Sequence, residues 1–214
     1  MDAALEAELP APLRLALAHA PRPVRPATLA LFALDARLAG FVRRGSEPLL
    51  AQMRLAWWRD TLGTASSAWP QGDPLLELLR GWQAPERLVP LVDGWEGLLA
   101  EQLDREAIRD FAEGRVKAWQ VLASEIGMKG SPVESAARAW ALGDLAGNLS
   151  DPSERAMVLG VAAGEPLVPS RARALRPLAI LGGLGRRSLA RGGVPLLDGR
   201  GAALAALRLG MFGR

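Results

Sequence analysis

Apolar residues recur at helical spacing along most of the chain, and no segment alternates between apolar and polar residues as a half-buried strand would. Two apolar stripes are the clearest, one in the first quarter of the chain and one near its middle: Leu31, Leu34, Leu38 and Phe41, and Ile108, Phe111, Trp119, Leu122 and Ile126. Alanine, leucine and arginine dominate the composition, which favours helix over strand. The pattern therefore predicts an all-α protein.

Prolines, glycines and capping residues divide this pattern into separate helices. Residues 21–26, PRPVRP, predict a stiff extended connector. Pro48 lies where the first turn of a helix tolerates proline, and Gly63 is placed to end that helix. Residues 182–185, GGLG, follow no predicted strand, so we expect close helix packing there rather than a phosphate cradle. The predicted helix caps are Thr28, Ser46, Asp104 and Ser131.

The length of 214 residues predicts a single domain over residues 1–214, with residues 1–26 as a helical and proline-rich N-terminal extension. The chain has no cysteine and no tyrosine, and its one histidine is His19. Thiol chemistry and a Cys/His metal cluster are therefore excluded. We interpret His19 as a surface or helix-end residue near the proline-rich connector.

The net charge of +3 conceals a strongly basic C-terminal region: residues 171–214 contain nine arginines and the single acid Asp198. This region predicts contact with a membrane surface or a protein partner, and the alternative is a solvated helix face. Nucleic acid is not expected as a partner, because aromatic residues do not interleave with these arginines. No apolar run reaches the roughly 18 residues that span a bilayer, and the acidic N-terminus MDAALEAELP does not resemble a signal peptide. We therefore expect a cytoplasmic protein.

The stretch LAQMRLAWWRDTLG, residues 50–63, combines two tryptophans with an Arg–Asp pair. On a helix, Trp57 and Trp58 point about 100° apart. We therefore expect one indole to enter the core and the other to pack against a neighbouring helix. Arg59 and Asp60 are expected to anchor the helix through charge-assisted hydrogen bonds. The alternative is that the tryptophans form the wall of a ligand site.

Six segments, in the same order, resemble the squalene/phytoene synthase family, which couples prenyl diphosphates head to head. The most specific is MRLAWWRDTL, which is similar to the family pattern RLxxWRxxL. The others are ATLALFALDARLAGFV, LVPLVDGWEGLL, DFAEGRVKAWQVLASEIG, ALGDLAGNL and LVPSRARALRPLAILGGLGRRSLARGG. The resemblance covers the chain from about residue 27 to its end. It implies a helix bundle of the isoprenoid synthase type around a central apolar cavity, which makes Trp119 a further cavity or packing candidate.

In that family, two aspartate-rich motifs hold Mg²⁺, which in turn holds the substrate diphosphate. This chain departs from both motifs. About one turn after Asp35, where a DDxxD pattern is expected, it has Ala39, Gly40 and Arg43. Where RDxxxD is expected it reads AGNLSDPSE, and Asp144 lies one turn early. An arginine in place of a metal ligand repels Mg²⁺.

The resemblance therefore points to a non-catalytic member of the family with no metal and no cofactor. A divergent branch of the family serves the assembly of respiratory complex I, and the chain is similar to that branch. Such a protein would hold a prenyl or lipid ligand, or none, and would contact a partner or the inner membrane from its periphery.

The alternative is a Mg²⁺-dependent prenyltransferase of squalene or phytoene type, with Asp35, Asp93 and Asp144 as a rearranged metal set. Asp93 and Glu96 share a helix face and form a residual polar site, which arginines such as Arg115 would neutralise if no metal binds. The arrangement of these acids separates the two hypotheses. Carboxylates that converge on an open apolar tunnel favour the enzyme, whereas a filled core with aspartates paired to arginines favours the binding protein.

Overall fold

The computed structural model describes residues 2–43, 47–128, 133–166 and 173–212. These residues form α-helices joined by loops and four short 3₁₀ segments, and no strand occurs among them. The α-helices are α1 (Asp2–Glu8), α2 (Ala11–Ala18), α3 (Arg25–Arg43), α4 (Pro48–Gly63), α5 (Pro74–Arg80), α6 (Val89–Gly97), α7 (Arg105–Glu125), α8 (Glu134–Asn148), α9 (Pro152–Ala162), α10 (Arg176–Ala190) and α11 (Arg200–Phe212). The predicted all-α fold is confirmed.

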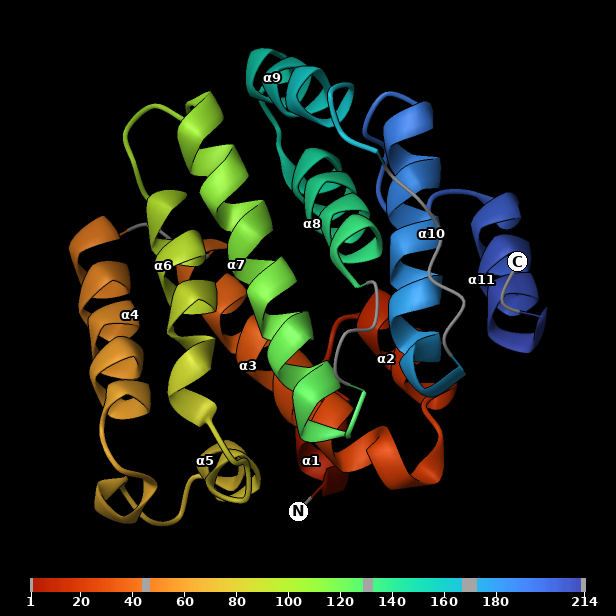
Figure 1. Ribbon diagram of the computed structural model, residues 1–214. Coiled ribbons are helices and arrows are strands. Elements are labelled where there is room, and N and C mark those ends of the chain that lie inside the picture. Colours follow the sequence, from red (N-terminus) through yellow and green to blue (C-terminus); the bar gives the residue numbers. More distant parts are fainter. Residues whose placement is uncertain (1, 44–46, 129–132, 167–172, 213–214) are drawn as a thin grey trace.

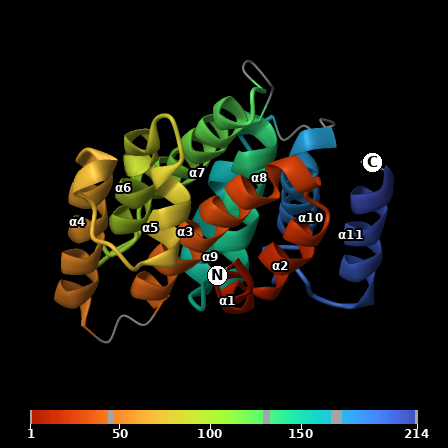
Figure 2. The same ribbon diagram turned by 90° about the horizontal axis from the view of Figure 1, so that it is seen from below.

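Six of the helices stand side by side in a row, in the order α4, α6, α7, α8, α10 and α11 (Figure 1). Helix α3 packs against α4, α6 and α7, and α2 packs against α3 and α10. Seen from below, α1, α2 and α3 lie on one side of α7 and α8 (Figure 2). The N-terminal helices are thus part of the bundle: they bury the leucines Leu5, Leu9, Leu13 and Leu17 in the common core.

Three aromatic side chains fill the space between α3, α7 and α8. The ring centroids of Phe32, Trp119 and Trp140 lie 5.9–6.4 Å apart, and Trp119 meets the other two rings edge to face. All three side chains are buried. This cluster fixes the spacing of the helices that carry the candidate site.

Glycines on α8 and α10 bring the two backbones close together, as expected for the segment 182–185. A Cβ atom on Gly185 would lie 2.1 Å from the carbonyl oxygen of Ala139, and one on Gly143 would lie 2.5 Å from the Cα atom of Gly185. Only glycine permits this separation, because neither contact leaves room for a side chain. The close crossing sets the position of Asp144, one residue beyond Gly143.

Several helix ends differ from the prediction. Thr28 does not cap a helix: α3 begins at Arg25, directly after a 3₁₀ turn over Arg22–Val24, so residues 21–26 do not form an extended connector. The proline of the first turn lacks an N–H that would have needed a partner, which allows the early start. The Thr28 hydroxyl instead donates to the carbonyl oxygen of Val24 at 2.8 Å, inside the helix.

Other helix ends agree with the sequence pattern. Asp104 caps α7 as predicted, and its carboxylate accepts from the amide of Ala107 at 2.8 Å. Helix α4 has Pro48 in its first turn and ends at Gly63. The predicted caps Ser46 and Ser131 lie outside the described residues.

Candidate functional site

Arg115, in the middle of α7, carries a buried charge: only 2% of its side chain is exposed. Its guanidinium donates two hydrogen bonds to the carboxylate of Asp35 on α3, from Nε at 3.0 Å and from Nη2 at 2.8 Å. Nη1 donates to Oδ2 of Asp144 on α8 at 3.0 Å. One arginine therefore joins three helices and pairs with two carboxylates.

Aromatic rings enclose this arginine. Its guanidinium carbon lies 4.0 Å from the ring centroid of Trp140, 4.8 Å from that of Phe111 and 5.1 Å from that of Trp95. Trp95 also donates from Nε1 to Oδ1 of Asp35 at 3.0 Å. Burial by itself lowers the pKa of Arg115, but attraction to the two carboxylates outweighs it and holds the pKa above its ordinary value. Arg115 is therefore a fixed cation at the centre of the site.

Asp144 connects this buried network to the surface. Its Oδ1 accepts from Nδ2 of Asn148 at 3.1 Å, and its Oδ2 lies 3.8 Å from Nη2 of Arg43. Arg43 is the last residue of α3, and 43% of its side chain is exposed. Arg115 and its two carboxylates are thus joined by hydrogen bonds. Arg43, at the outer end of the network, makes only the 3.8 Å contact with Asp144.

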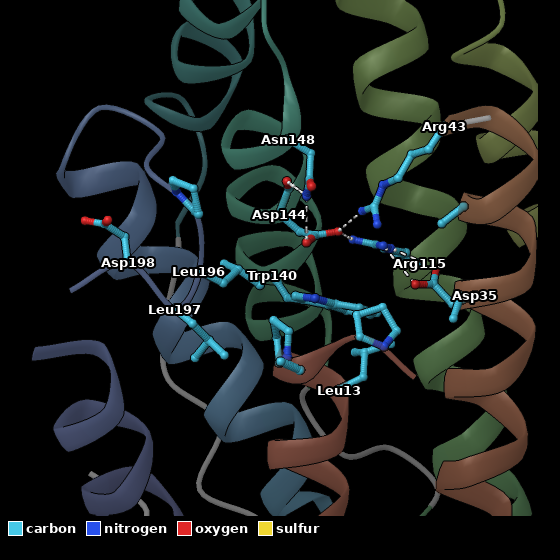
Figure 3. A pocket seen from close by; sticks show the side chains of 16 residues that line it. Leu13, Asp35, Arg43, Arg115, Trp140, Asp144, Asn148, Leu196, Leu197 and Asp198 are labelled. Carbon is cyan, nitrogen blue, oxygen red and sulfur yellow. Dashed lines mark hydrogen bonds and ion pairs between the residues drawn. The ribbon is translucent and has the colours of Figure 1, made fainter. Parts of the chain in front are cut away.

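A pocket of about 330 Å³ opens beside the network (Figure 3). Five residues of the network line one side of it, namely Asp35, Arg43, Arg115, Asp144 and Asn148, and Asp198 lines it on the far side. Its apolar wall comes from Trp140, from the start of α2 and from the segment before α11, and includes Leu13, Leu196 and Leu197. The pocket therefore offers a largely apolar space, with most of its charged groups along the side of the network and Asp198 on the other.

A second pocket of about 140 Å³ shares Arg43, Asp144 and Asn148 with the first. The rest of its lining is mainly apolar and includes Trp95 and Phe111. The Arg43–Asp144 contact therefore lies between two apolar spaces. The volume of the first pocket lies at the lower end of the 300–1,000 Å³ typical of small-molecule sites, and the volume of the second lies below that range.

The tryptophans named in the sequence analysis have different environments. Trp58 and Trp119 are buried in the core. Trp57, however, is 44% exposed and contacts Trp58 edge to face, with ring centroids 5.3 Å apart. The expectation that Trp57 packs against a neighbouring helix is therefore wrong, because α4 is the last helix of the row and nothing among the described residues covers its outer side.

Arg59 anchors α4 to α6, as expected. Its Nε donates to Asp93 at 2.7 Å, and its Nη2 also binds Glu96. The hydrogen bond that Arg59 donates to Glu96 is the largest influence on the pKa of Arg59 and raises it. Asp60 is exposed and makes no hydrogen bond or ion pair with the described residues, so its expected anchoring role is not seen.

The four candidate acids do not meet at one place. Asp35 and Asp144 share Arg115, whereas Asp93 and Glu96 pair with Arg59 on α4 and line neither of the two pockets. The rearranged metal set of Asp35, Asp93 and Asp144 is therefore not formed. The expectation that Arg115 neutralises Asp93 and Glu96 is also wrong, since α4 supplies their partner and α7 does not.

Sequence reasoning did not single out Arg115, Trp95, Trp140 or Asn148 as members of one site. A signal for Arg115 was present in the sequence. It lies on the apolar stripe of α7, four residues after Phe111 and four before Trp119. A charged residue on a buried face needs a partner of opposite charge, and Asp35 stands on the apolar stripe of α3 in the same way.

The resemblance to prenyl synthases implies Mg²⁺, but these residues do not fit a magnesium site. Both oxygens of Asp35 accept hydrogen bonds from Arg115 or Trp95, and both oxygens of Asp144 have partners as well. Mg²⁺ requires carboxylate oxygens that are free to enter an octahedral shell. Across the described ranges, no group of three or more acidic or histidine side chains lies close enough to hold a metal ion.

Some arginines of the basic C-terminal region contact other residues of the protein, and others are exposed to solvent. Arg176 donates to the carbonyl oxygen of Leu209 at 3.5 Å and so connects α10 to α11, while Arg191 lies 4.0 Å from Asp198. Arg186 is half-buried, and burial lowers its pKa. No helix in the described part of the chain is both long and apolar enough to span a bilayer.

Comparison with known proteins supports the resemblance. The sequence profile of the squalene/phytoene synthase family matches residues 13–123, which is slightly more than half of the chain and includes Asp35, Arg43 and Arg115. No curated protein and no solved structure matches the chain significantly. The resemblance of residues 124–214 stays a prediction. Because this match covers more than half of the chain, and because the described residues form an all-α bundle, the chain belongs to the squalene/phytoene synthase family.

Proposed function

We propose that this protein is a non-catalytic member of its family, which binds an apolar prenyl or lipid ligand in the pocket beside Asp144 and acts as a binding or assembly factor. The observation that carries the proposal is the pairing of Asp35 and Asp144 with the buried Arg115. The two acids that lie nearest to the expected metal-binding motifs are thereby bound to an internal cation.

The energetics of this pairing support the loss of metal chemistry. A metal ion could bind Asp35 only by displacing a guanidinium that is itself 2% exposed. That displacement would leave a buried arginine with Asp144 as its remaining carboxylate, and the loss of one partner from a buried ion pair typically costs about 3–5 kcal/mol. Ionisation of a prenyl diphosphate also needs a cation on the leaving group, and the carboxylates of Asp35 and Asp144 beside the pocket are both bound to Arg115.

The shape of the pocket supports an apolar ligand. Leu13, Leu196, Leu197 and Trp140 belong to its apolar wall. The charges of Asp35, Arg115 and Asp144 on the other side are already paired. A ligand with an apolar body would displace water from the leucines without separating an ion pair. A role in assembly of a respiratory complex is the more specific form of this proposal, and it rests on the similarity of the sequence to that branch of the family.

A direct assay separates this proposal from the prenyltransferase alternative. Purified protein is incubated with Mg²⁺ and farnesyl or geranylgeranyl diphosphate, and pyrophosphate is measured. We expect release no faster than in a sample without protein. Release well above that background, abolished by Asp144→Asn, would establish the enzyme and overturn the proposal.

Ligand binding is tested on the same protein with a pair of matched variants. Ala36 lines the pocket on α3, and Ala27 lines a separate hollow on the same helix. Ala36→Phe should narrow the pocket and reduce binding of geranylgeraniol, measured by calorimetry, whereas Ala27→Phe should leave binding unchanged. Equal affinity in all three proteins would show that the pocket does not hold this ligand.

A further inference from the structure

The two pockets at the candidate site meet at a contact between two side chains. Arg43, Asp144 and Asn148 line both pockets, and the other residues of each lining are different. Nη2 of Arg43 lies 3.8 Å from Oδ2 of Asp144, and Arg43 makes no other ion pair with the described residues. The Arg43–Asp144 contact therefore stands between the two apolar spaces.

Arg43 can leave this contact without exposing Asp144 as an unpaired charge. The side chain of Arg43 is 43% exposed, and an ion pair with so exposed a partner contributes little to stability. Asp144 keeps two other partners, because Nη1 of Arg115 and Nδ2 of Asn148 both donate to its carboxylate. A rotation of Arg43 toward solvent would therefore cost little and would join the two pockets.

The second pocket is too small to hold a whole ligand, but its wall suits one end of an apolar chain. It is lined by four leucines from the ends of α6 and α8 and from the loop before α7: Leu98, Leu103, Leu145 and Leu149. A methylene group fills roughly the volume of one water molecule, about 30 Å³. The first pocket therefore holds on the order of ten carbon atoms, and the second about five more.

The interior of the bundle offers a chain no comparable space beside the first pocket. The rings of Phe32, Trp119 and Trp140 fill the region between α3, α7 and α8, and the guanidinium of Arg115 rests on Trp140. A chain that outgrows the first pocket thus meets packed rings on the side of Trp140. On the side of Arg43 it meets a side chain that can move away.

We propose that the two pockets are parts of one elongated site, and that Arg43 is a movable partition that the ligand displaces. The ligand class is then a single long apolar chain of about fifteen carbon atoms or more, which crosses the ends of α3 and α8. This inference rests on the proposed function, because it extends the same pocket. It adds the shape of the ligand and assigns the selection of chain length to Arg43 and the second pocket.

Chain length provides the test on the full protein. The probes are geraniol, which matches the first pocket, and farnesol, which is one isoprene unit longer, with affinities measured by calorimetry. Ala36→Phe narrows the first pocket and should weaken the binding of both alcohols. Ala100→Phe narrows the second pocket from an exposed position. It should weaken farnesol about tenfold and change geraniol less than about twofold, because only the longer chain buries carbon there.

Val42→Phe, on the opposite wall of the second pocket, repeats this test in case the new ring at position 100 turns to solvent. Arg43→Ala tests the partition itself. It should tighten farnesol binding by about two- to fivefold, because no ion pair then has to be broken. Arg54→Ala is the matched control, since Arg54 on α4 lines neither of the two pockets. It should leave both affinities unchanged, and circular dichroism verifies that every variant is folded.

The results separate this inference from the proposed function. If the unsubstituted protein binds neither alcohol, both are overturned. If it binds both, and farnesol affinity survives Ala100→Phe and Val42→Phe, the ligand is confined to the first pocket and only the elongated site is overturned. Weaker farnesol binding by the Arg43→Ala variant would also overturn the inference, since Arg43 would then hold the ligand instead of dividing the site.

Discussion

Arg115 shows how one side chain determines the chemistry of the site. Its five N–H donors allow it to bind two carboxylates from different helices while its flat face rests on aromatic rings. A lysine could not make the same set of contacts. The charge of Arg115 is buried and is paired with the two carboxylates. Separating them therefore costs more free energy than separating an exposed ion pair.

Loss of a carboxylate should lower the free energy of unfolding more in the buried Arg115 network than in the exposed ion pair between Arg59 and Asp93. Asp35→Asn keeps the shape of the side chain but leaves Arg115 with Asp144 alone, so we expect the free energy of unfolding to fall by about 3–5 kcal/mol. Asp93→Asn removes a carboxylate that is half-exposed and bound to Arg59. That change should cost no more than about 1 kcal/mol. Urea denaturation followed by circular dichroism measures both, and equal losses would contradict the central role of Arg115.

At the scale of helices, the contact between α8 and α10 positions the site. Gly143, Gly182 and Gly185 let the two backbones approach until no Cβ atom fits between them. Ser188 adds a hydrogen bond from α10 to the carbonyl oxygen of Gly143 at 3.0 Å. Trp140 and Asp144 belong to the same stretch of α8, so their distance from α7 depends on how closely α10 packs behind them.

Gly185→Ala should therefore act on both stability and the site. The added Cβ would meet the backbone of Ala139, which cannot move independently of α8, and we expect a loss of about 1–3 kcal/mol. Gly40→Ala on α3 is the matched control, because nothing lies within 4 Å of its Cβ position. It should stabilise the helix by about 0.5–1 kcal/mol. Thermal denaturation of both variants tests this, and a neutral Gly185→Ala would mean that the helices can separate at little cost.

At the scale of the whole molecule, segments near both ends of the described chain meet at the site. Helices α1 and α2 cover the core with buried leucines, and the start of α2 meets the segment before α11 across the pocket. The candidate site thus draws on residues from both ends of the described chain. Its integrity should depend on segments that are far from Arg115 in sequence.

Deletion of residues 2–18 tests this dependence. The deletion exposes core that Leu5, Leu9, Leu13 and Leu17 cover, and each buried leucine typically contributes about 1.5–3 kcal/mol. We expect the shortened chain to lose its cooperative thermal transition and to bind a dye specific for exposed apolar surface. A shortened chain that unfolds at the same temperature as the full chain would show that the N-terminal helices are an appendage.

The sequence by itself determined the helices, the family and the residues that face the core, because helical periodicity and caps such as Asp104 act between neighbours along the chain. It did not place the start of α3 at Arg25, where local signals from Thr28 and from three prolines compete. Tertiary structure decided which charges meet. Asp35 and Arg115 are 80 residues apart, and Arg59 is 34 residues from Asp93. Such pairs depend on where helices cross, and the crossing is set by glycine contacts and aromatic packing over the whole bundle, which no local pattern records.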